Sequence, residues 1–183
     1  NNMHRALASA PVTTSVTTSA QASAAHALLP AAWLLALTAL EALHPLRRAV
    51  EDKARRAVRN LAFSALGAVA IQLVEMPLAL WLAALVERHG WGLLPHLPLP
   101  SALRCVLAVL LMDYTLYIWH VIVHKAPALW RLHRVHHADL DLDASTALRF
   151  HFAEHLASVP YRLAQVLLLG VTPAQFLIWQ AFL

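Results

Sequence analysis

Long apolar runs constrain the fold of this chain more than any other feature of its sequence. They cover residues 27–43, 61–86 and 102–123, and about 20 apolar residues suffice to cross the hydrocarbon core of a bilayer. The run 27–43 has 17 residues and is marginal, and Pro77 is expected to kink the helix formed by 61–86. We therefore expect an all-α integral membrane bundle with about three spanning helices.

Composition supports this class and excludes others. Hydrophobic residues make up 60% of the chain and charged residues only 13%, which is too apolar for an ordinary soluble domain. The net charge of +4 comes from basic residues in short segments between apolar runs, a pattern typical of membrane-protein loops rather than of nucleic-acid binding. Because Cys105 is the only cysteine, we expect no disulfide framework and no thiolate metal site.

The two ends of the chain differ from its middle. Residues 1–25 are rich in Ala, Ser and Thr, and we expect a disordered tail before one membrane-embedded domain, residues 26–183. Residues 156–183 are expected to form a helical hairpin that dips into the membrane, with its second arm started by Thr172 and Pro173. The chain stops inside this arm, so we expect it to be incomplete at its C-terminus.

The distribution of charge between the loops predicts the orientation of the chain in the membrane. The segment 44–60 carries six Lys and Arg residues, whereas the loop 87–101 carries one. By the positive-inside rule, 44–60 lies in the cytosol and 87–101 on the opposite side. The run 102–123 then returns to the cytosol and presents the residues at its end to that side.

Histidines are concentrated around the end of the third apolar run. Seven of the twelve fall between positions 120 and 155, at helical spacings that place each group on one face. Pro127 is expected to start the helix that carries the second group, and Ser145 or Thr146 to cap the helix that carries the third. Three consecutive helical segments thus present imidazoles, namely His120 and His124, then His133, His136 and His137, then His151 and His155.

A lone histidine on a helix is more often a core or surface residue than a ligand, but seven within 36 residues indicate a metal or cofactor site. Imidazole suits zinc, iron, copper and nickel, and one structural zinc needs only about four ligands. Seven histidines therefore favour two metal ions that share a site. The nearby carboxylates of Asp113, Asp139 and Glu154 are candidates to orient the ring N–H groups, although each could equally be a cap or a surface charge.

Two polar residues precede the first histidine pair on the same helix. Asp113 and Tyr117 share one narrow stripe with His120 and His124 because the spacings are i, i+4, i+7 and i+11. Ionisable groups within a membrane helix usually face a bundle interior or a polar cavity. The stripe therefore indicates either a polar seam against a neighbouring helix or the wall of a cavity.

The stretch "DYTLYIWHVIVHKAPALWRLHRVHHADLDLDASTALRFHFAE" resembles the core of the sterol desaturase/fatty acid hydroxylase superfamily. The family pattern is an HxxxH box, an HxxHH box followed by an acidic residue, and a T-A-L-R-x-H element, which here contains Arg149 and His151. Three features depart from the family. Val121 and Lys125 stand where members often have arginine, and His155 is an additional histidine beyond the most common bacterial pattern. The family's final HxxHH box is missing because the chain stops at Leu183.

The resemblance implies a membrane-bound, non-haem di-iron oxygenase that uses dioxygen and an external electron donor to hydroxylate or desaturate a lipid. Together with the loop charges and the composition, it indicates a bacterial inner membrane, an active site facing the cytosol and no nucleic-acid partner. The seven histidines would bind two iron ions, supported by Asp113, Asp139, Arg149 and Glu154. We expect further ligands beyond Leu183, and little metal binding or turnover from this chain alone.

Two other function classes remain open at this point. A bis-histidine haem electron carrier needs about two to four histidines inside the bilayer, and a metal transporter needs polar ligands along several spans, whereas 61–86 offers only Glu75. Metal analysis with an optical spectrum separates both from a di-iron oxygenase. The substrate, which could be a sterol, hopanoid, fatty acyl, sphingoid or carotenoid lipid, is also open, as is the choice between hydroxylation and desaturation.

The orientation can be tested by cysteine-accessibility labelling. Cysteines introduced by Val50→Cys and Leu140→Cys should react with an impermeant reagent from the cytosolic side, and one introduced by Leu93→Cys from the other side. Labelling of position 93 from the same side as position 50 would show the orientation to be wrong.

Overall fold

The computed structural model describes residues 32–41, 43–44, 50–141 and 143–182, and every regular element in these ranges is a helix. The all-α prediction is therefore confirmed for the described residues. The expected tail, residues 1–25, and part of the first apolar run, 27–43, lie outside them.

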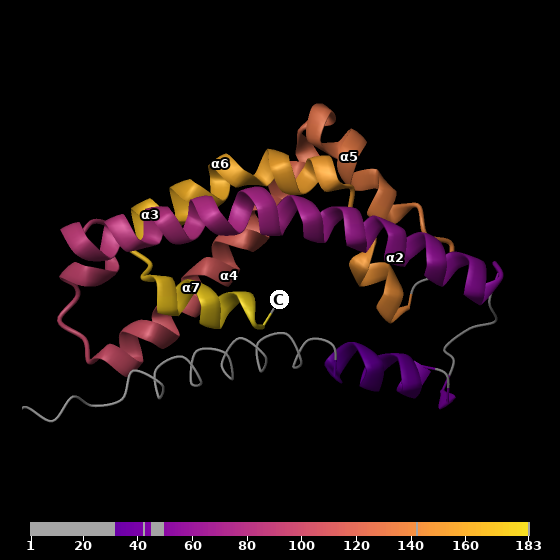
Figure 1. The fold of residues 1–183 in the computed structure, drawn as a ribbon, viewed down its shortest axis with the longest axis horizontal. Helices are drawn as coiled ribbons and strands as arrows, with labels where there is room; N and C mark the ends of the chain where they lie inside the picture. Colours follow the sequence, from indigo (N-terminus) through magenta and orange to yellow (C-terminus); the bar gives the residue numbers. More distant parts are fainter. Residues whose placement is uncertain (1–31, 42, 45–49, 142, 183) are drawn as a thin grey trace, which may run out of the picture.

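One long arched helix is the longest element of the fold (Figure 1). It consists of α2 (Lys53–Ala70), a π-helical turn η1 (Ile71–Glu75) and α3 (Met76–His89). Pro77 cannot donate a backbone hydrogen bond, and the wider π-helical turn directly before it accommodates the missing donor without ending the helix. The irregularity expected at Pro77 thus takes the form of a π-helical turn.

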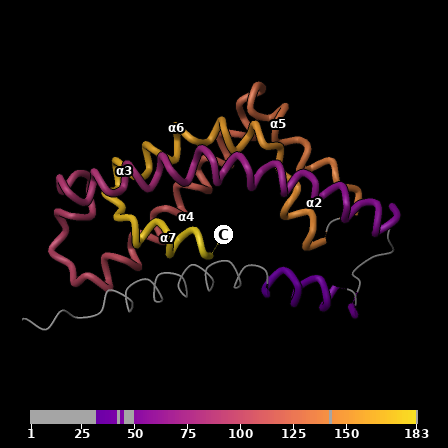
Figure 2. The backbone as a smooth tube through the Cα atoms, in the orientation of Figure 1, coloured from indigo at the N-terminus to yellow at the C-terminus, as the bar shows by residue number. Residues whose placement is uncertain are grey.

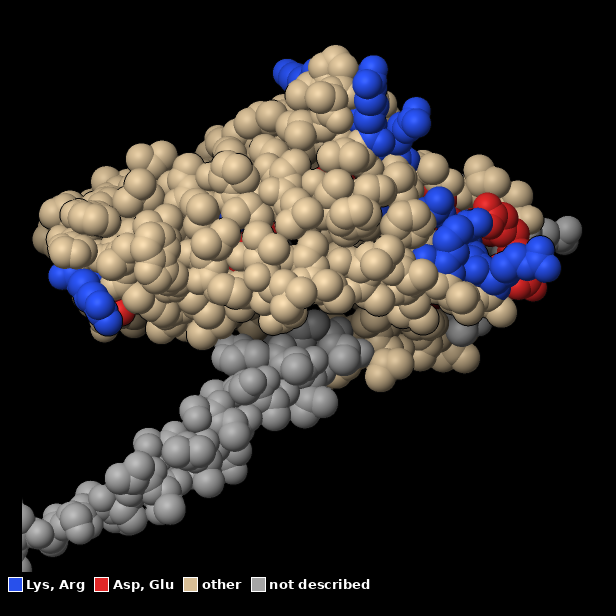
Figure 3. Space-filling view, turned by 45° about the horizontal axis from the view of Figure 1, so that its top comes forward, with Lys and Arg blue, Asp and Glu red and all other residues tan. Residues whose placement is uncertain are grey.

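Two helical segments have the length and composition to cross a membrane, Lys53–His96 and the segment of α4 (Ser101–Lys125). The short η2 (Leu94–His96) precedes the turn between them. Within the first apolar run, the structure describes the short apolar helix Ala32–Glu41. Figure 3 shows a broad uncharged band between groups of charged side chains, as a membrane-embedded bundle requires.

The last two helices form the expected hairpin against this frame. α6 (Phe152–Leu169) runs along α2 and α3, and α7 (Pro173–Gln180) folds back to pack on α3 and α4 (Figure 2). Thr172 accepts a hydrogen bond from the backbone N–H of Gln175, and Pro173 occupies the first turn, which confirms the predicted start of the second arm.

The apolar core lies where α3, α4, α6 and α7 meet. Ala79, Ala83 and Ala108 are fully or almost fully buried, and these small side chains allow the helices to approach closely. Phe176 and Trp179 from α7 are also buried and fill the space beneath them. The short α7 is therefore held mainly by burial of its two large aromatic side chains.

A buried polar junction connects α6 to η1, α4 and α7. Arg162 Nε lies 3.1 Å from Glu75 Oε1, and its guanidinium stacks on Trp179 with 4.3 Å to the ring centroid. Gln165 accepts from Arg162 and donates to Thr115 Oγ1 at 2.5 Å. Because unpaired buried charges are costly, these partners determine the register of α6 against η1 and α4.

Gly170 makes the reversal between α6 and α7 possible. Its φ is +78°, in the left-handed region, and a Cβ at this position would lie 2.5 Å from Pro95 Cδ and 2.6 Å from the Trp91 carbonyl oxygen. Any larger residue would have to displace the turn that precedes α4.

We predict that Gly170→Ala lowers the free energy of unfolding by about 2–4 kcal/mol, because left-handed strain and a clash with backbone add together. The matched control is Gly90→Ala, where φ is +65° but no atom beyond the two neighbouring residues lies within 4 Å of the new Cβ. The control should cost only about 1–2 kcal/mol. Denaturant unfolding in detergent micelles measures both, and equal losses would contradict the packing argument.

Candidate metal centre

A sharp elbow between two helices brings the first two groups of histidines together. α4 ends at Lys125, Ala126 adopts an extended conformation, and α5 (Pro127–His137) begins at Pro127, as predicted. Proline disfavours a helical conformation in the residue before it but suits the first turn of the helix that follows. The chain therefore turns at Ala126, and the histidine face of α5 packs onto the end of α4.

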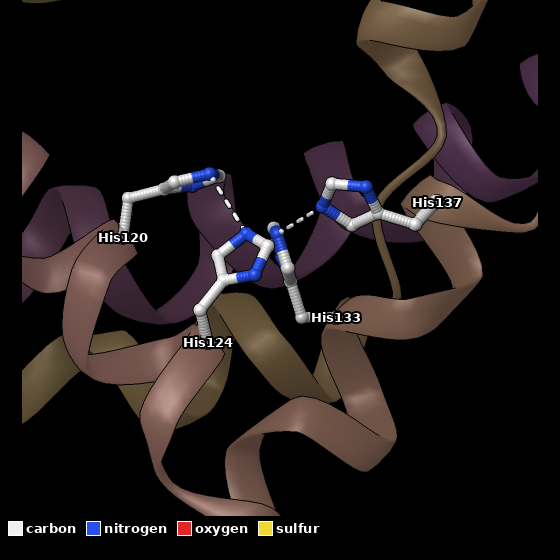
Figure 4. A group of neighbouring side chains, drawn as sticks. All are labelled: His120, His124, His133 and His137. Carbon is white, nitrogen blue, oxygen red and sulfur yellow. Dashed lines mark hydrogen bonds between the residues drawn. The ribbon is translucent and has the colours of Figure 1, made fainter.

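Four rings meet at this elbow (Figure 4). One nitrogen of each of His120, His124, His133 and His137 lies within 4.8 Å of the others. The Nε2 atoms of His120 and His124 are 3.1 Å apart, and so are those of His133 and His137. The same nitrogen of each ring thus faces the centre of the group, which we call the four-histidine cluster.

The donor set of the four-histidine cluster fits a transition metal. Neutral imidazole nitrogens suit zinc, iron, copper and nickel. Burial, with a smaller contribution from neighbouring histidines, lowers the pKa of His133 to about 4, so this ring is neutral at physiological pH. His133 is fully buried, whereas the other three members are exposed.

Glu154 lies behind the buried member of the cluster. His133 Nδ1 is 2.8 Å from Glu154 Oε1, which leaves Nε2 to face the other rings. Burial raises the pKa of Glu154 to about 7, and Oε2 has no hydrogen-bond partner among the described residues. The carboxylate is supplied by the first turn of α6, where a negative charge is favoured by the helix dipole.

The other three predicted ligands lie outside the four-histidine cluster. His136 stacks on Phe150 at 4.6 Å between centroids, and its Nδ1 is buried with no hydrogen-bond partner among the described residues. His151 Nδ1 accepts from Ala153 N–H, and the His155 ring packs against Gly67 of α2. Metal binding by these three histidines stays a prediction.

The predicted cap of the third histidine helix is wrong. Asp143, rather than Ser145 or Thr146, begins a 3-10 turn, η3 (Ala144–Leu148), by accepting from the backbone N–H of Ser145. The following α-helix starts only after His151, whose side chain is its cap. His151 therefore precedes the helix that carries His155, and the two do not share a helical face.

Asp139 and Arg149 support the loop after the second histidine box rather than a ring of the cluster. Asp139 pairs with buried Arg56 at 3.2 Å and accepts from Asn60 at 3.1 Å and from Thr146 at 2.8 Å. Arg149 Nη1 lies 3.7 Å from the same carboxylate. These contacts tie the start of α2 to the loop 139–149.

Sequence reasoning missed Arg56, which also bonds Asp143 and the carbonyl oxygen of Asp141. It lies within the basic segment that the positive-inside rule explains as solvated charge. The sequence signal that could have identified it is the acidic run after the second histidine box, because three aspartates within five residues indicate a nearby cationic partner.

The predicted polar stripe on α4 is open. Asp113, Tyr117, His120 and His124 are all exposed, so no described element covers this face. Asp113 lies about 10 Å along the helix axis from His120, given 1.5 Å per residue. The stripe therefore fits the wall of an open cavity beside the four-histidine cluster better than a polar seam packed against a neighbouring helix.

Comparisons with known proteins match the part of the chain that contains the four-histidine cluster. The family model described as fatty acid hydroxylase matches residues 105–183. Ornithine lipid hydroxylase OlsE of Rhizobium tropici is 31% identical over 80 residues, which cover 44% of this chain and 24% of that protein. The chain thus spans about a quarter of the length of this curated relative. No solved structure matches the chain.

We predict that the full-length protein binds Co²⁺ or Zn²⁺ at the four-histidine cluster and that His124→Ala weakens this binding by at least about tenfold. The control is His89→Ala, since His89 stacks on Trp91 and is not part of the cluster. Competition titration with a chromophoric chelator measures both affinities. Unchanged affinity in the His124 variant would exclude this residue as a ligand.

Proposed function

We propose, from the match of residues 105–183 to the fatty acid hydroxylase family model, that this protein is a membrane-bound iron oxygenase that hydroxylates a lipid. The observation that carries the proposal is the four-histidine cluster, whose ring nitrogens lie within 4.8 Å at the end of an apolar helix. A metal held there lies where a membrane lipid can approach it from the bilayer.

The proposed cofactor is a pair of iron ions. The cluster supplies nitrogen donors for one ion, and His136, whose buried Nδ1 lacks a hydrogen-bond partner among the described residues, is the next donor toward a second. When bound, iron supplies the activation of dioxygen that attack on an unactivated C–H bond requires. His151 and His155 are proposed as further donors from this chain.

The chain's own residues bind the ions and leave access for the substrate. His120, His124 and His137 are exposed, so reactants can reach the cluster from the side opposite buried His133. Along α4 the exposed face continues through Leu110, Val106 and Leu103. We propose that the alkyl chain of the lipid lies along these apolar residues, with the carbon to be hydroxylated next to His120.

Hydroxylation requires two electrons from a reductant in every catalytic cycle. Insertion of one oxygen atom into a C–H bond reduces the other atom of dioxygen to water and consumes two electrons and two protons. Cys105 is the single thiol of the chain, so a dithiol reductant within the chain is excluded. An external electron donor is therefore part of the proposal, acting at the cytosolic face of a bacterial inner membrane.

The relative favours hydroxylation over desaturation and suggests a first substrate to test. Its name states that it hydroxylates ornithine lipid. We therefore propose a polar membrane lipid that contains an amino acid. The cluster also favours a non-haem centre, because four imidazoles converge on one point, whereas a bis-histidine haem uses two.

We expect the full-length protein, produced in a bacterium that makes ornithine lipid, to add one oxygen atom to that lipid in an iron-dependent way. Mass spectrometry of the lipid extract detects the product, and His133→Ala should abolish it. His89→Ala should leave it unchanged. A Soret band in the purified protein, or zinc as the only bound metal, would contradict the proposal.

A further inference from the structure

Glu154 is a buried carboxylate, and its one side-chain hydrogen bond among the described residues is to His133. It is 7% exposed, its Oε1 lies 2.8 Å from His133 Nδ1, and Oε2 has no hydrogen-bond partner among the described residues. No ion pair with Lys or Arg is formed by this side chain in the described structure. A carboxylate buried in this way costs free energy unless a nearby positive charge offsets the loss of hydration.

We propose that Glu154 is a positioning residue that accepts the Nδ1–H of His133 and so directs the Nε2 lone pair of this ring to the metal. The inference rests on the proposed function in one respect, that the four-histidine cluster holds a metal ion. It assigns a role to a side chain that comes from α6, a different helix from those that carry the cluster.

The geometry around His133 leaves one tautomer that serves metal binding. Nε2 lies 3.1 Å from His137 Nε2 at the centre of the cluster, where a proton would block a metal. The proton must therefore be on Nδ1, and the hydrogen bond made by one ring nitrogen determines which nitrogen binds the metal. A bound cation would also offset the burial of the carboxylate through the shared ring.

His133 is the member of the cluster that most needs such a partner. It is fully buried, whereas His120, His124 and His137 are exposed and can be oriented by water. Glu154 is in turn held in place by the rest of α6. The Arg162–Glu75 ion pair anchors this helix two turns further along, about 12 Å away at 1.5 Å per residue.

The test compares Co²⁺ affinity of the full-length protein and three variants in detergent. Glu154→Ala should weaken binding about 10–100-fold, the range found when a partner of a metal-binding histidine is removed. Glu154→Gln should lose less than about tenfold, since an amide oxygen still accepts the Nδ1–H. The matched control is Ser158→Ala, one turn along α6 and equally buried but bonded only to its own helix, which should bind Co²⁺ like the wild type.

Two results would overturn the assignment: unchanged affinity in Glu154→Ala, or equal losses in the Ala and Gln variants. A second measurement applies even if Glu154→Ala does not fold. Nitrogen-15 NMR of metal-free, histidine-labelled wild type should show His133 protonated on Nδ1 and not on Nε2, and the opposite tautomer would refute the proposal. Both tests use Co²⁺ or no metal, so absent lipid hydroxylation would count against the proposed function alone.

Discussion

The buried ion pair between Arg162 and Glu75 is the contact on which the arrangement of the other helices depends. A guanidinium and a carboxylate within an apolar bundle must meet each other, because neither can reach water. The pair joins α6 to the π-helical turn of the long helix, and Gln165 and Trp179 extend it to α4 and α7. One junction thus determines how four helices are placed along one another.

The geometry of the four-histidine cluster depends on how α6 is placed. α4 and α5 bring four histidines together through the elbow at Ala126. The ring of His133 is also hydrogen-bonded to Glu154, a carboxylate from α6. A sliding of α6 by one residue would move Glu154 about 1.5 Å along the axis and rotate it by about 100°. The polar junction in the middle of the bundle therefore bears on the geometry of the cluster.

A second group of buried polar side chains positions the loop that follows the second histidine box. Arg56 and Asn60 from α2 hold Asp139, and Asp139 holds Thr146 in the loop before α6. This loop carries Phe150, on which His136 stacks. The long helix therefore contributes no ligand to the four-histidine cluster and yet supports both the loop and the helix that surround it.

Much of the site was determined by the sequence alone, because its signals are local. Helical spacing placed His120 with His124 and His133 with His137 on common faces, and Pro127 marked the elbow between the two helices. The apolar runs predicted an all-helical membrane bundle, and Thr172 and Pro173 predicted the start of α7. Each inference used residues within a single continuous segment of the chain.

The tertiary structure decided what depends on contacts between distant segments. Asp139 and Glu154 were both candidates to orient a histidine, and sequence could not separate them, since each is a carboxylate near a histidine box. In the structure Asp139 is taken by Arg56, 83 residues away, whereas Glu154 reaches His133 across a helix interface. The cap at Asp143 was missed for a related reason, because Asp, Ser and Thr in one run can all cap a helix. Chain spacing determines which side chains share a face, but only packing determines which buried charges find each other.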